Sequence, residues 1–349
     1  MGGDGMSQRN HEITKSGPLL DSKGAPIEPG WSRKMLLTYD RSAIKAPAFR
    51  IKEWDYYLVI SNKENAGFAF TLSDDGYIGL QSVSLLDFSI PFEHTETILN
   101  AFPMGRMNMP STSEKGDAAY YDRRLSLEFI KTPGKRRIVS RFKDFRLGKP
   151  FRCDIVLEEP PMDSMVLVKP WKEDKKAFYY NQKINCMRAS GTVEYDGRVY
   201  ELDPETDFGT LDWGRGVWTY DNTWYWGSGN GVVNGKLFGF NIGYGFADDS
   251  AATENVIFYD GKAHKLDEIR FNIPDTSYTD QWTFTSSDGR FEMTFDPIID
   301  RAAKIDVKFI VTDQHQVFGR MNGRCVLDDG TVLEVKDLLC FAEDVHNRY

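Results

Sequence analysis

The sequence predicts an all-β protein, built from two antiparallel lipocalin-like (calycin-type) β-barrels that lie side by side. Short runs of β-branched and aromatic residues recur along the whole chain of 349 residues, and they alternate as strands do. Turn-forming dipeptides separate these runs. No segment has the length and spacing of a long amphipathic helix. Aromatic residues at 13% and 30 glycines fit many strands joined by tight turns.

The first half of the chain divides into an arm and a series of strands. Residues 1–30 are polar and rich in Gly and Pro, which predicts an extended N-terminal arm. The strand-like runs that follow are "MLLTYD", "WDYYLVISN", "FAFTLS", "YIGLQSVSLLDFS", "RLSLEFI", "RIVSRF", "FRCDIVLE" and "MVLVKP". A turn or two of helix is expected at most near residues 93–102 and 338–345.

The second half contains four Asp-Gly dipeptides between strand-like runs, at residues 196–197, 260–261, 288–289 and 329–330. Asp-Gly between alternating apolar runs is a strong hairpin signal. The charged stretch "PWKEDKKA", residues 170–177, lies between the two β-rich halves. We therefore predict an N-terminal barrel over residues 31–175 and a C-terminal barrel over residues 176–349.

Charge and composition bear on the partners of the protein. The formal net charge of −9 argues against a non-specific binder of nucleic acid or anionic membrane, which would need a clustered basic face. The sequence contains no run of about 18 apolar residues, so no membrane span is expected. No signal peptide is visible. We expect a cytoplasmic protein whose natural start is Met6, preceded by a leader at residues 1–5.

Four scattered cysteines and five dispersed histidines show no metal-ligand spacing. We expect reduced, mostly buried thiols and no metal site. Neither a nucleotide-binding motif nor a nucleophile elbow is present, so no cofactor is expected. The oligomeric state is left open.

Two neighbouring segments carry the most information about a binding site. "LDWGRGVWTYDNTWYWGSGNG", residues 211–231, holds four of the eight tryptophans and resembles a hairpin around residues 221–222. "KLFGFNIGYGF", residues 236–246, alternates bulky apolar residues with three glycines and Asn241. The glycines predict barrel curvature or room for a ligand. We expect the Trp segment and the bare face of the glycine strand to form opposite walls of one pocket.

Carboxyl groups in apolar surroundings are the candidate catalytic acids, because burial raises a carboxyl pKa. Asp212 and Glu254 are the candidate catalytic residues, and a structural Asp212–Arg215 ion pair is the competing expectation for Asp212. The candidate binding residues are Arg215, Trp218, Trp224, Trp226, Asn241, Tyr244 and Glu343.

Several segments resemble the domain-of-unknown-function family numbered 2804. They are "KINCMRASG", "LDWGRGVW", "NTWYWGSGNG", "FGFNIGYGF", "ATENVIFYDGKAHKL" and the ending "FAEDVHNRY". The chain is more remotely similar to carotenoid 1,2-hydratases and tocopherol cyclases, which are built from two lipocalin-like barrels. That likeness implies protonation of a double bond by a carboxylic acid. Those proteins read roughly Asp-His-x-Trp-Gly where this chain has Leu211 in place of the histidine, so the reaction does not transfer.

The sequence predicts a protein that binds an apolar or amphipathic, isoprenoid- or lipid-like small molecule in a β-barrel pocket. Cofactor-independent hydratase, cyclase or isomerase chemistry is one expectation. A non-catalytic lipid carrier is a second. A carbohydrate-binding β-sandwich is a third, and it would need several of these tryptophans at the surface.

Overall fold

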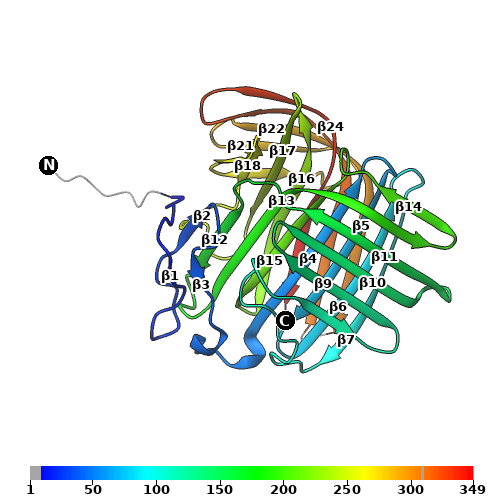
Figure 1. Cartoon of the computed structure of the whole chain (residues 1–349). Coiled ribbons are helices and arrows are strands. Elements are labelled where there is room, and N and C mark those ends of the chain that lie inside the picture. Colours follow the sequence, from blue (N-terminus) through cyan, green and yellow to red (C-terminus); the bar gives the residue numbers. More distant parts are fainter. Residues whose placement is uncertain (1–8, 308–309, 349) are drawn as a thin grey trace.

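The structure, a computed structural model, describes residues 9–307 and 310–348 (Figure 1). Residues 1–5 and Met6, the expected leader and start, lie outside this part. The predicted all-β fold is confirmed: two strongly curled antiparallel sheets form half-barrels. The described helices are two single 3-10 turns, η1 at Arg41–Ala43 and η2 at Ala48–Arg50. Within the described ranges, no helix is long and apolar enough to cross a membrane.

The first sheet has 13 strands, ten of which follow one continuous path. That path runs β7 (Phe92–Ala101), β6 (Ile78–Asp87), β5 (Ala66–Asp74), β4 (Ile51–Ser61), β15 (Phe208–Val217), β13 (Phe178–Tyr195), β11 (Lys149–Glu158), β10 (Lys135–Arg146), β9 (Leu125–Thr132) and β8 (Ala118–Tyr121). Beside it lie β12 (Met165–Pro170), β14 (Arg198–Leu202) and β2 (Gly30–Ser32).

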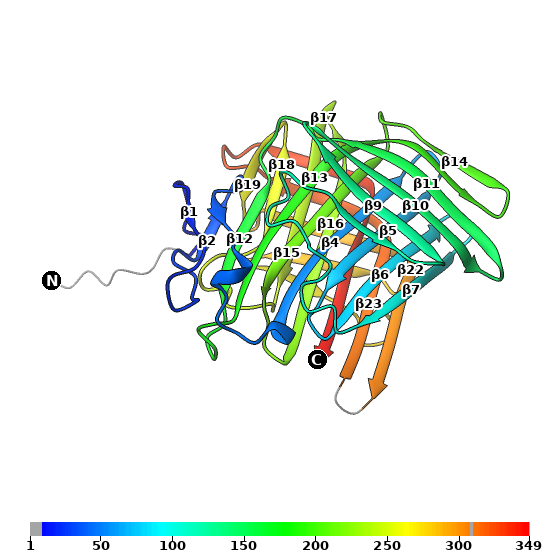
Figure 2. The ribbon, with the colours of Figure 1, turned by 60° about the horizontal axis from the view of Figure 1, so that its bottom comes forward.

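The second sheet has nine strands. In spatial order they are β19 (Lys262–Lys265), β18 (Val256–Tyr259), β17 (Lys236–Tyr244), β16 (Asp221–Val233), β24 (Val332–Arg348), β23 (Ile310–Val326), β22 (Phe291–Val307), β21 (Trp282–Ser286) and β20 (Ile269–Asn272). All four Asp-Gly dipeptides form turns between paired strands, as predicted. β22 and β23 project together beyond the lower end of the first sheet (Figure 2).

Each half-barrel has its own apolar interior, because alternate side chains of every strand point to one face. Phe70, Leu127 and Trp213 are among the residues that fill the first interior, and Phe240, Trp282 and Phe295 are among those that fill the second. The opposite faces of the two sheets pack against each other. Two further apolar clusters occupy this interface, one around Tyr179 and Phe246 and the other around Leu58 and Phe341.

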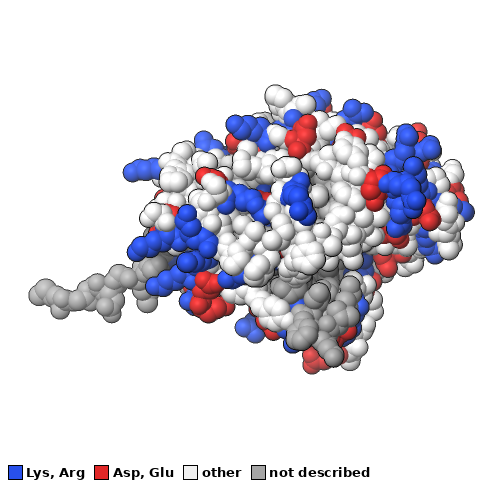
Figure 3. All heavy atoms as spheres, turned by 90° about the horizontal axis from the view of Figure 1, so that it is seen from below, with Lys and Arg blue, Asp and Glu red and all other residues white. Residues whose placement is uncertain are grey.

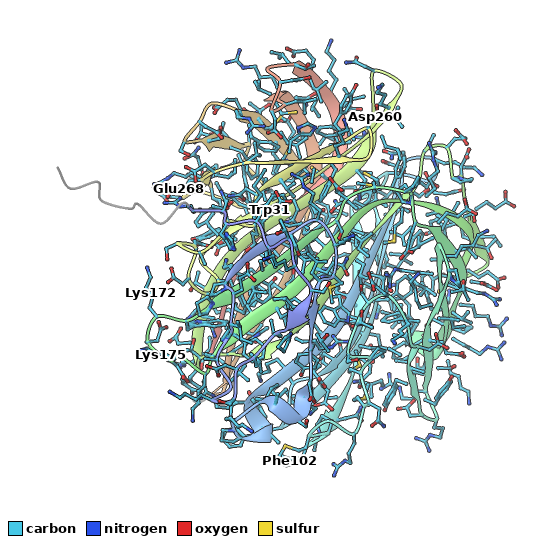
Figure 4. All side chains as sticks on the ribbon, turned by 60° about the vertical axis from the view of Figure 1, so that its left-hand side comes forward. Trp31, Phe102, Lys172, Lys175, Asp260 and Glu268 are labelled. Atoms are coloured by element: carbon cyan, nitrogen blue, oxygen red, sulfur yellow. The ribbon has the colours of Figure 1, made fainter. Side chains whose placement is uncertain are left out.

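The N-terminal arm lies along the outside of the two packed sheets. β1 (Gly17–Pro18) pairs in parallel with β3 (Leu37–Thr38), and β2 pairs with β12. Trp31 is 3% exposed, and its Nε1 donates to Asn10 O at 3.1 Å. Figure 4 shows Trp31 beneath the arm, against the middle of the molecule. Trp31, which directly follows the arm and is hydrogen-bonded to it, therefore adds a buried aromatic ring to the interface.

The chain passes from one sheet to the other between Val217 and Asp221. The expected hairpin around residues 221–222 is wrong: β15 pairs with β4 and β13, whereas β16 pairs with β17 and β24. Trp218, which directly follows β15, and Trp224 on β16 both lie at the interface between the sheets. The strands on either side of residue 176 share the first sheet, and the division into domains at that residue stays a prediction.

Two other local expectations are corrected. Residues 93–101 and 338–345 lie in β7 and β24 rather than in helical turns. β24 is central to its sheet, where pairing with β16 and β23 outweighs the helix propensity of its Leu, Ala and Glu residues. The Trp segment and the glycine strand are adjacent paired strands, β16 and β17, and not opposite walls.

Candidate functional site

A group of buried polar side chains lies between the two sheets, flanked by the two interface apolar clusters. We call it the inter-sheet polar cluster. It consists of Lys169, Asn181, Lys183 and Asp212 from the first sheet, with Asn241, Glu254, Gln316 and Glu343 from the second; each is at most 9% exposed. Burying so many charges is costly unless they are paired or neutralised.

Strand alternation brings these residues to the interface. On β13, Tyr179, Asn181, Lys183 and Asn185 occupy alternate positions and face the second sheet. The residues between them, such as Phe178 and Tyr180, enter the interior of the first half-barrel. On β15, Asp212 lies directly across from Lys183. On β24, Glu343 lies across from both Trp226 and Gln316.

Asp212 is held by two donors from β13. Lys183 Nζ lies 2.9 Å from Asp212 Oδ2, and Asn181 Nδ2 donates to Oδ1 at 2.6 Å. Lys183 Nζ is also 3.8 Å from the centre of the Trp226 ring, a cation–π contact. Asp212 thus accepts from the amide of Asn181 and pairs with the ammonium group of Lys183 across the two strands.

The expected Asp212–Arg215 ion pair is wrong. The two residues are three positions apart on one strand, so their side chains point to opposite faces. Arg215 is fully buried in the first half-barrel, where it contacts Asp55 Oδ1 at 3.0 Å and the Pro110 carbonyl at 2.8 Å. Its guanidinium also covers the Trp213 ring at 4.3 Å. Arg215 therefore lies outside the inter-sheet polar cluster.

Glu343 is the carboxyl group best placed to hold a proton. It is 4% exposed. Trp224 Nε1 donates to its Oε1 at 2.9 Å, and Gln316 Nε2 donates to its Oε2 at 2.9 Å. Burial raises the pKa of Glu343 to about 7, against the opposing effects of these two bonds, Lys183 and Arg301. A carboxyl group with such a pKa exchanges its proton near neutral pH.

Glu254 lies at the other side of the cluster, beside the glycine strand. Its Oε1 is 3.8 Å from Lys169 Nζ, which also binds Asp249 Oδ1 at 2.5 Å. Burial raises the pKa of Glu254, and Lys169 and Lys183 oppose that shift. A Cβ on Gly243 would lie 2.9 Å from the Glu254 carboxyl carbon. The bare face of β17 therefore makes room for this carboxyl.

The three candidate tryptophans gather at the interface. The rings of Trp54, Trp218, Trp224 and Phe246 pack edge to face, with the Trp218 ring centre 5.2 Å from Trp54, 6.1 Å from Trp224 and 4.8 Å from Phe246. We call these four the aromatic group. Trp54, Trp218 and Trp224 are half-buried, and the Trp224 indole is hydrogen-bonded to the buried Glu343 carboxyl.

Trp226 is buried deeper, at 5% exposed, and its Nε1 donates to Asn241 Oδ1 at 2.7 Å. Asn241 in turn donates to the Glu254 carbonyl at 2.7 Å. Trp226 lies directly across from Gly243, so a large ring covers a bare glycine in the neighbouring strand. None of the three candidate tryptophans forms the exposed platform that carbohydrate binding would need.

Tyr244 does not join the cluster. It points to the opposite face of β17, where its ring stacks on Tyr225 with centres 4.6 Å apart. Of the sequence-predicted residues, the structure brings together Asp212, Glu254, Glu343, Trp218, Trp224, Trp226 and Asn241, and it places Arg215 and Tyr244 elsewhere.

Two hollows of the protein lie away from the cluster. One, of about 410 Å³, is on the outer face of β10, β11 and β13 between Arg141, Arg152 and Glu194. The other, of about 10 Å³, lies beside Asp55 and Arg136 and has room for about one water. Neither contains a member of the cluster.

Among the described residues, no three His, Cys, Asp or Glu side chains are grouped as a metal site would require. The four cysteines are free and buried. The groups that the inter-sheet polar cluster and its aromatic neighbours supply include carboxyl, ammonium, amide, phenol and indole groups.

A family model describes the chain from residue 10 to residue 349, the domain of unknown function DUF2804. The chain belongs to the DUF2804 family. No curated protein matches this DUF2804 chain.

The DUF2804 chain is similar in structure to an AttH-like protein from Nitrosomonas europaea, with a TM-score of 0.55 and 13% identity over 94% of this chain and 98% of that one. It is also similar to kievitone hydratase from Nectria haematococca, with a TM-score of 0.47 and 9% identity over 95% and 98% of the two chains. A third similar structure is that of CghA with Sch210972, with a TM-score of 0.45 and 10% identity over 95% of this chain and 97% of that one. At these identities the first likeness shows a shared fold.

Sequence reasoning missed Lys169, Asn181, Lys183 and Gln316. Lys183 lies in the segment "KINCMRASG", which was used only for the family resemblance. A signal was present: Asn181, Lys183 and Asn185 recur at alternate positions of a run whose other positions include Phe178 and Tyr180. Polar residues with a period of two mark one face of this strand, β13. That face is normally assigned to solvent, and here a second sheet covers it.

Proposed function

We propose that the protein binds an apolar or amphipathic small molecule between its two sheets and protonates it with Glu343. The observation that carries the proposal is the placement of Glu343. It is a buried carboxyl group with two neutral hydrogen-bond donors, and it lies directly beneath a half-buried ring of the aromatic group. The resulting chemistry would be that of a hydratase, cyclase or isomerase.

The aromatic group supplies the complementary half of such a site. Indole and phenyl faces bind apolar surface, and they stabilise positive charge that develops over them. In the proposed step, the O–H of Glu343 breaks and its proton adds to one carbon of a double bond. Water captures the resulting cation and returns a proton to the Glu343 carboxylate. In an isomerase, the cation instead loses a neighbouring proton to the Glu343 carboxylate. In a cyclase, a second double bond first attacks the cation, and the new cation then loses a proton to that carboxylate.

The other charged members of the inter-sheet polar cluster have supporting roles in the proposal. Lys183 stabilises the carboxylate that Glu343 becomes after it gives up its proton, and Asp212 holds Lys183 at the interface. Glu254 is the second candidate acid, since burial raises its pKa too. Asp212, predicted from sequence as an acid, fits a positioning role better because Lys183 and Asn181 hold it.

A non-catalytic carrier of apolar molecules in the cytoplasm is the second candidate. One observation favours it: the charged groups of the cluster are bound to one another or to nearby residues, as in Lys183–Asp212 and Lys169–Asp249. Such pairing is what a carrier needs to line an interface that performs no chemistry.

Incubation in heavy water distinguishes the two candidates. The protein is mixed with a total isoprenoid and lipid extract in D₂O, and bound and free molecules are compared by mass spectrometry. Protonation by Glu343 incorporates deuterium at carbon or adds one heavy water. A carrier binds its ligand without any change in mass.

The matched variants are Glu343→Gln and Asp344→Asn. Asp344 is the next residue, but its side chain is on the opposite face, where Tyr278 donates to it at 3.0 Å. We expect Glu343→Gln to abolish deuterium incorporation and Asp344→Asn to retain it. Incorporation that survives Glu343→Gln would refute the assignment of Glu343 as the acid.

A further inference from the structure

Two buried side chains of β13 each carry a polar atom that has no hydrogen-bond partner among the described residues. The atoms are Oδ1 of Asn181 and the hydroxyl oxygen of Tyr179. Asn181 is 0% exposed and Tyr179 is 4% exposed. Buried polar atoms are nearly always paired in folded proteins, so two unpaired atoms on one strand need an explanation. Neither atom takes part in the proposed step at Glu343.

The amide of Asn181 has a fixed orientation. Its Nδ2 donates to Trp213 O at 2.7 Å and to Asp212 Oδ1 at 2.6 Å. Because a backbone carbonyl can only accept, the nitrogen must face Trp213 O, and the amide oxygen must point the other way. Asn181 therefore presents a buried acceptor that lacks a donor.

The hydroxyl of Tyr179 is the complementary donor. Burial raises the pKa of this phenol well above its usual range, and the carboxyl groups of Glu254, Asp212 and Glu343 raise it further. The phenol therefore keeps its proton at neutral pH. The three carboxyl groups all belong to the inter-sheet polar cluster, so the hydroxyl lies beside that cluster.

One indole ring adjoins both of these side chains. Asn181 and Tyr179 are two positions apart on β13 and face the second sheet. Gly214 lies across from Asn181, and Trp54 lies across from Gly214. The Trp54 ring covers this glycine, since a Cβ there would lie 1.9 Å from Cζ2 of Trp54. The same ring stacks on Tyr179 with centres 6.0 Å apart. The unpaired acceptor and the unpaired donor thus border one edge of the aromatic group.

We propose that Tyr179 and Asn181 form a hydroxyl subsite, so that the ligand is an unsaturated apolar molecule with a free hydroxyl group, either an alcohol or a phenol. The ligand oxygen accepts from the Tyr179 hydroxyl, and the ligand O–H donates to Asn181 Oδ1, which pairs both atoms with one group. A site built in this way rejects an analogue without the hydroxyl, because its own polar atoms are then left unpaired. The inference rests on the proposed function, since it needs a ligand between the sheets.

The surroundings of the hydroxyl subsite suit the apolar remainder of such a ligand. Phe246 packs edge to face against Tyr179 and Trp218, with ring centres 4.9 Å and 4.8 Å apart. Trp224 pairs with Val345 near the end of β24, and this strand ends toward the lower side of the molecule (Figure 2). Seen from below, broad areas of the surface carry no Lys, Arg, Asp or Glu (Figure 3). Apolar walls with a few convergent polar groups are typical of small-molecule sites.

Binding of matched small molecules tests the proposal. Farnesol represents the alcohols and 2-prenylphenol the phenols. Each is compared with its methyl ether and with the hydrocarbon in which hydrogen replaces the hydroxyl group, and dissociation constants are measured by equilibrium dialysis from cyclodextrin. The ether should bind to wild type about tenfold more weakly than the hydroxyl compound, because it cannot donate to Asn181. The tighter of the two hydroxyl compounds tells whether the ligand is an alcohol or a phenol.

Tyr179→Phe removes the donor and keeps the ring. This variant should bind the hydroxyl compound about fivefold more weakly and the hydrocarbon as tightly as wild type does. Tyr180→Phe is the matched control, because the Tyr180 side chain lies on the opposite face and its hydroxyl donates to Leu37 O at 2.8 Å. It should bind both compounds as wild type does. In urea unfolding without ligand, Tyr180→Phe should be less stable than wild type, whereas Tyr179→Phe should lose no stability because its hydroxyl has no partner to lose.

Three results would overturn the hydroxyl subsite. The first is a Tyr179→Phe variant that binds the hydroxyl compound as tightly as wild type does, or that weakens the hydrocarbon equally. The second is a loss of stability in Tyr179→Phe as large as that in Tyr180→Phe, which would mean that the hydroxyl is paired within the protein. The third is failure of every one of these molecules to bind, which would also refute ligand binding between the sheets. Hydroxyl-dependent binding without deuterium incorporation would support the subsite and refute only protonation by Glu343.

Discussion

The indole of Trp224 donates a hydrogen bond to the buried carboxyl of Glu343, with Nε1 and Oε1 2.9 Å apart. The two residues come from adjacent strands of the second sheet, and both side chains face the first sheet. Trp224 is half-buried, whereas Glu343 is buried. The bond therefore connects partly solvent-accessible aromatic surface to a carboxyl whose pKa is about 7.

Replacing Glu343 with Gln should flatten the pH dependence of stability. Burial raises the folded-state pKa from 4.5 to about 7, so between these values the folded state binds more protons than the unfolded state. The free energy of unfolding therefore falls as pH rises, by about 3 kcal/mol in total for this group. Urea unfolding at pH 5 and pH 8 should show a smaller decrease in Glu343→Gln than in wild type. If the free energy of unfolding decreased equally between pH 5 and pH 8 in wild type and Glu343→Gln, the pKa of Glu343 would lie near its ordinary value.

Replacing Trp224 with Phe should raise the pKa of Glu343 further. Burial raises this pKa, and the Trp224 bond is the largest effect that opposes it. Phe keeps an aromatic ring but removes the donor, so we expect an upward shift of about one pH unit. Carboxyl resonances followed by NMR across a pH titration measure it. Trp226→Phe is the control, because Trp226 donates to Asn241 instead; an equal shift there would contradict a direct effect.

Lys183 and Asp212 should be coupled in stability. Their atoms Nζ and Oδ2 are 2.9 Å apart, and the side chains are 2% and 12% exposed. Lys183→Met leaves the Asp212 carboxylate buried without its cation, which should cost about 3–5 kcal/mol. Adding Asp212→Asn should recover part of that loss. A double-mutant cycle by urea unfolding gives the coupling energy, and simple additivity of the two substitutions would argue against an energetically important ion pair.

Gly214 should not tolerate alanine. An added Cβ would lie 1.9 Å from Cζ2 of Trp54, which is part of the aromatic group. Displacing a rigid indole should cost about 3 kcal/mol or more, beyond the usual range for one extra methyl group. Gly17→Ala is the control, since a Cβ there meets nothing within 4 Å. Thermal unfolding compares the two variants; equal melting temperatures would mean that Trp54 relocates easily.

The local patterns of the sequence determined the all-β fold. Asp-Gly turns such as Asp196–Gly197 connect strands that are close in the chain, and alternation assigns each side chain to one of two faces. The same alternation could have excluded the Asp212–Arg215 pair, since residues three apart in a strand point to opposite sides. These properties follow from a few neighbouring residues and need no knowledge of distant contacts.

Only the tertiary structure decided what each face meets. The sequence indicated Asp212 and Glu254 as acids and Glu343 as a binding residue, but their surroundings come from strands as distant as β12, β13 and β23. Whether the polar face of β13 meets water or a second sheet depends on how two curled sheets pack, and no local pattern encodes that. Packing pairs Asp212 with Lys183 and gives Glu343 a pKa of about 7, because desolvation and distant charges set the proton affinity of a buried group.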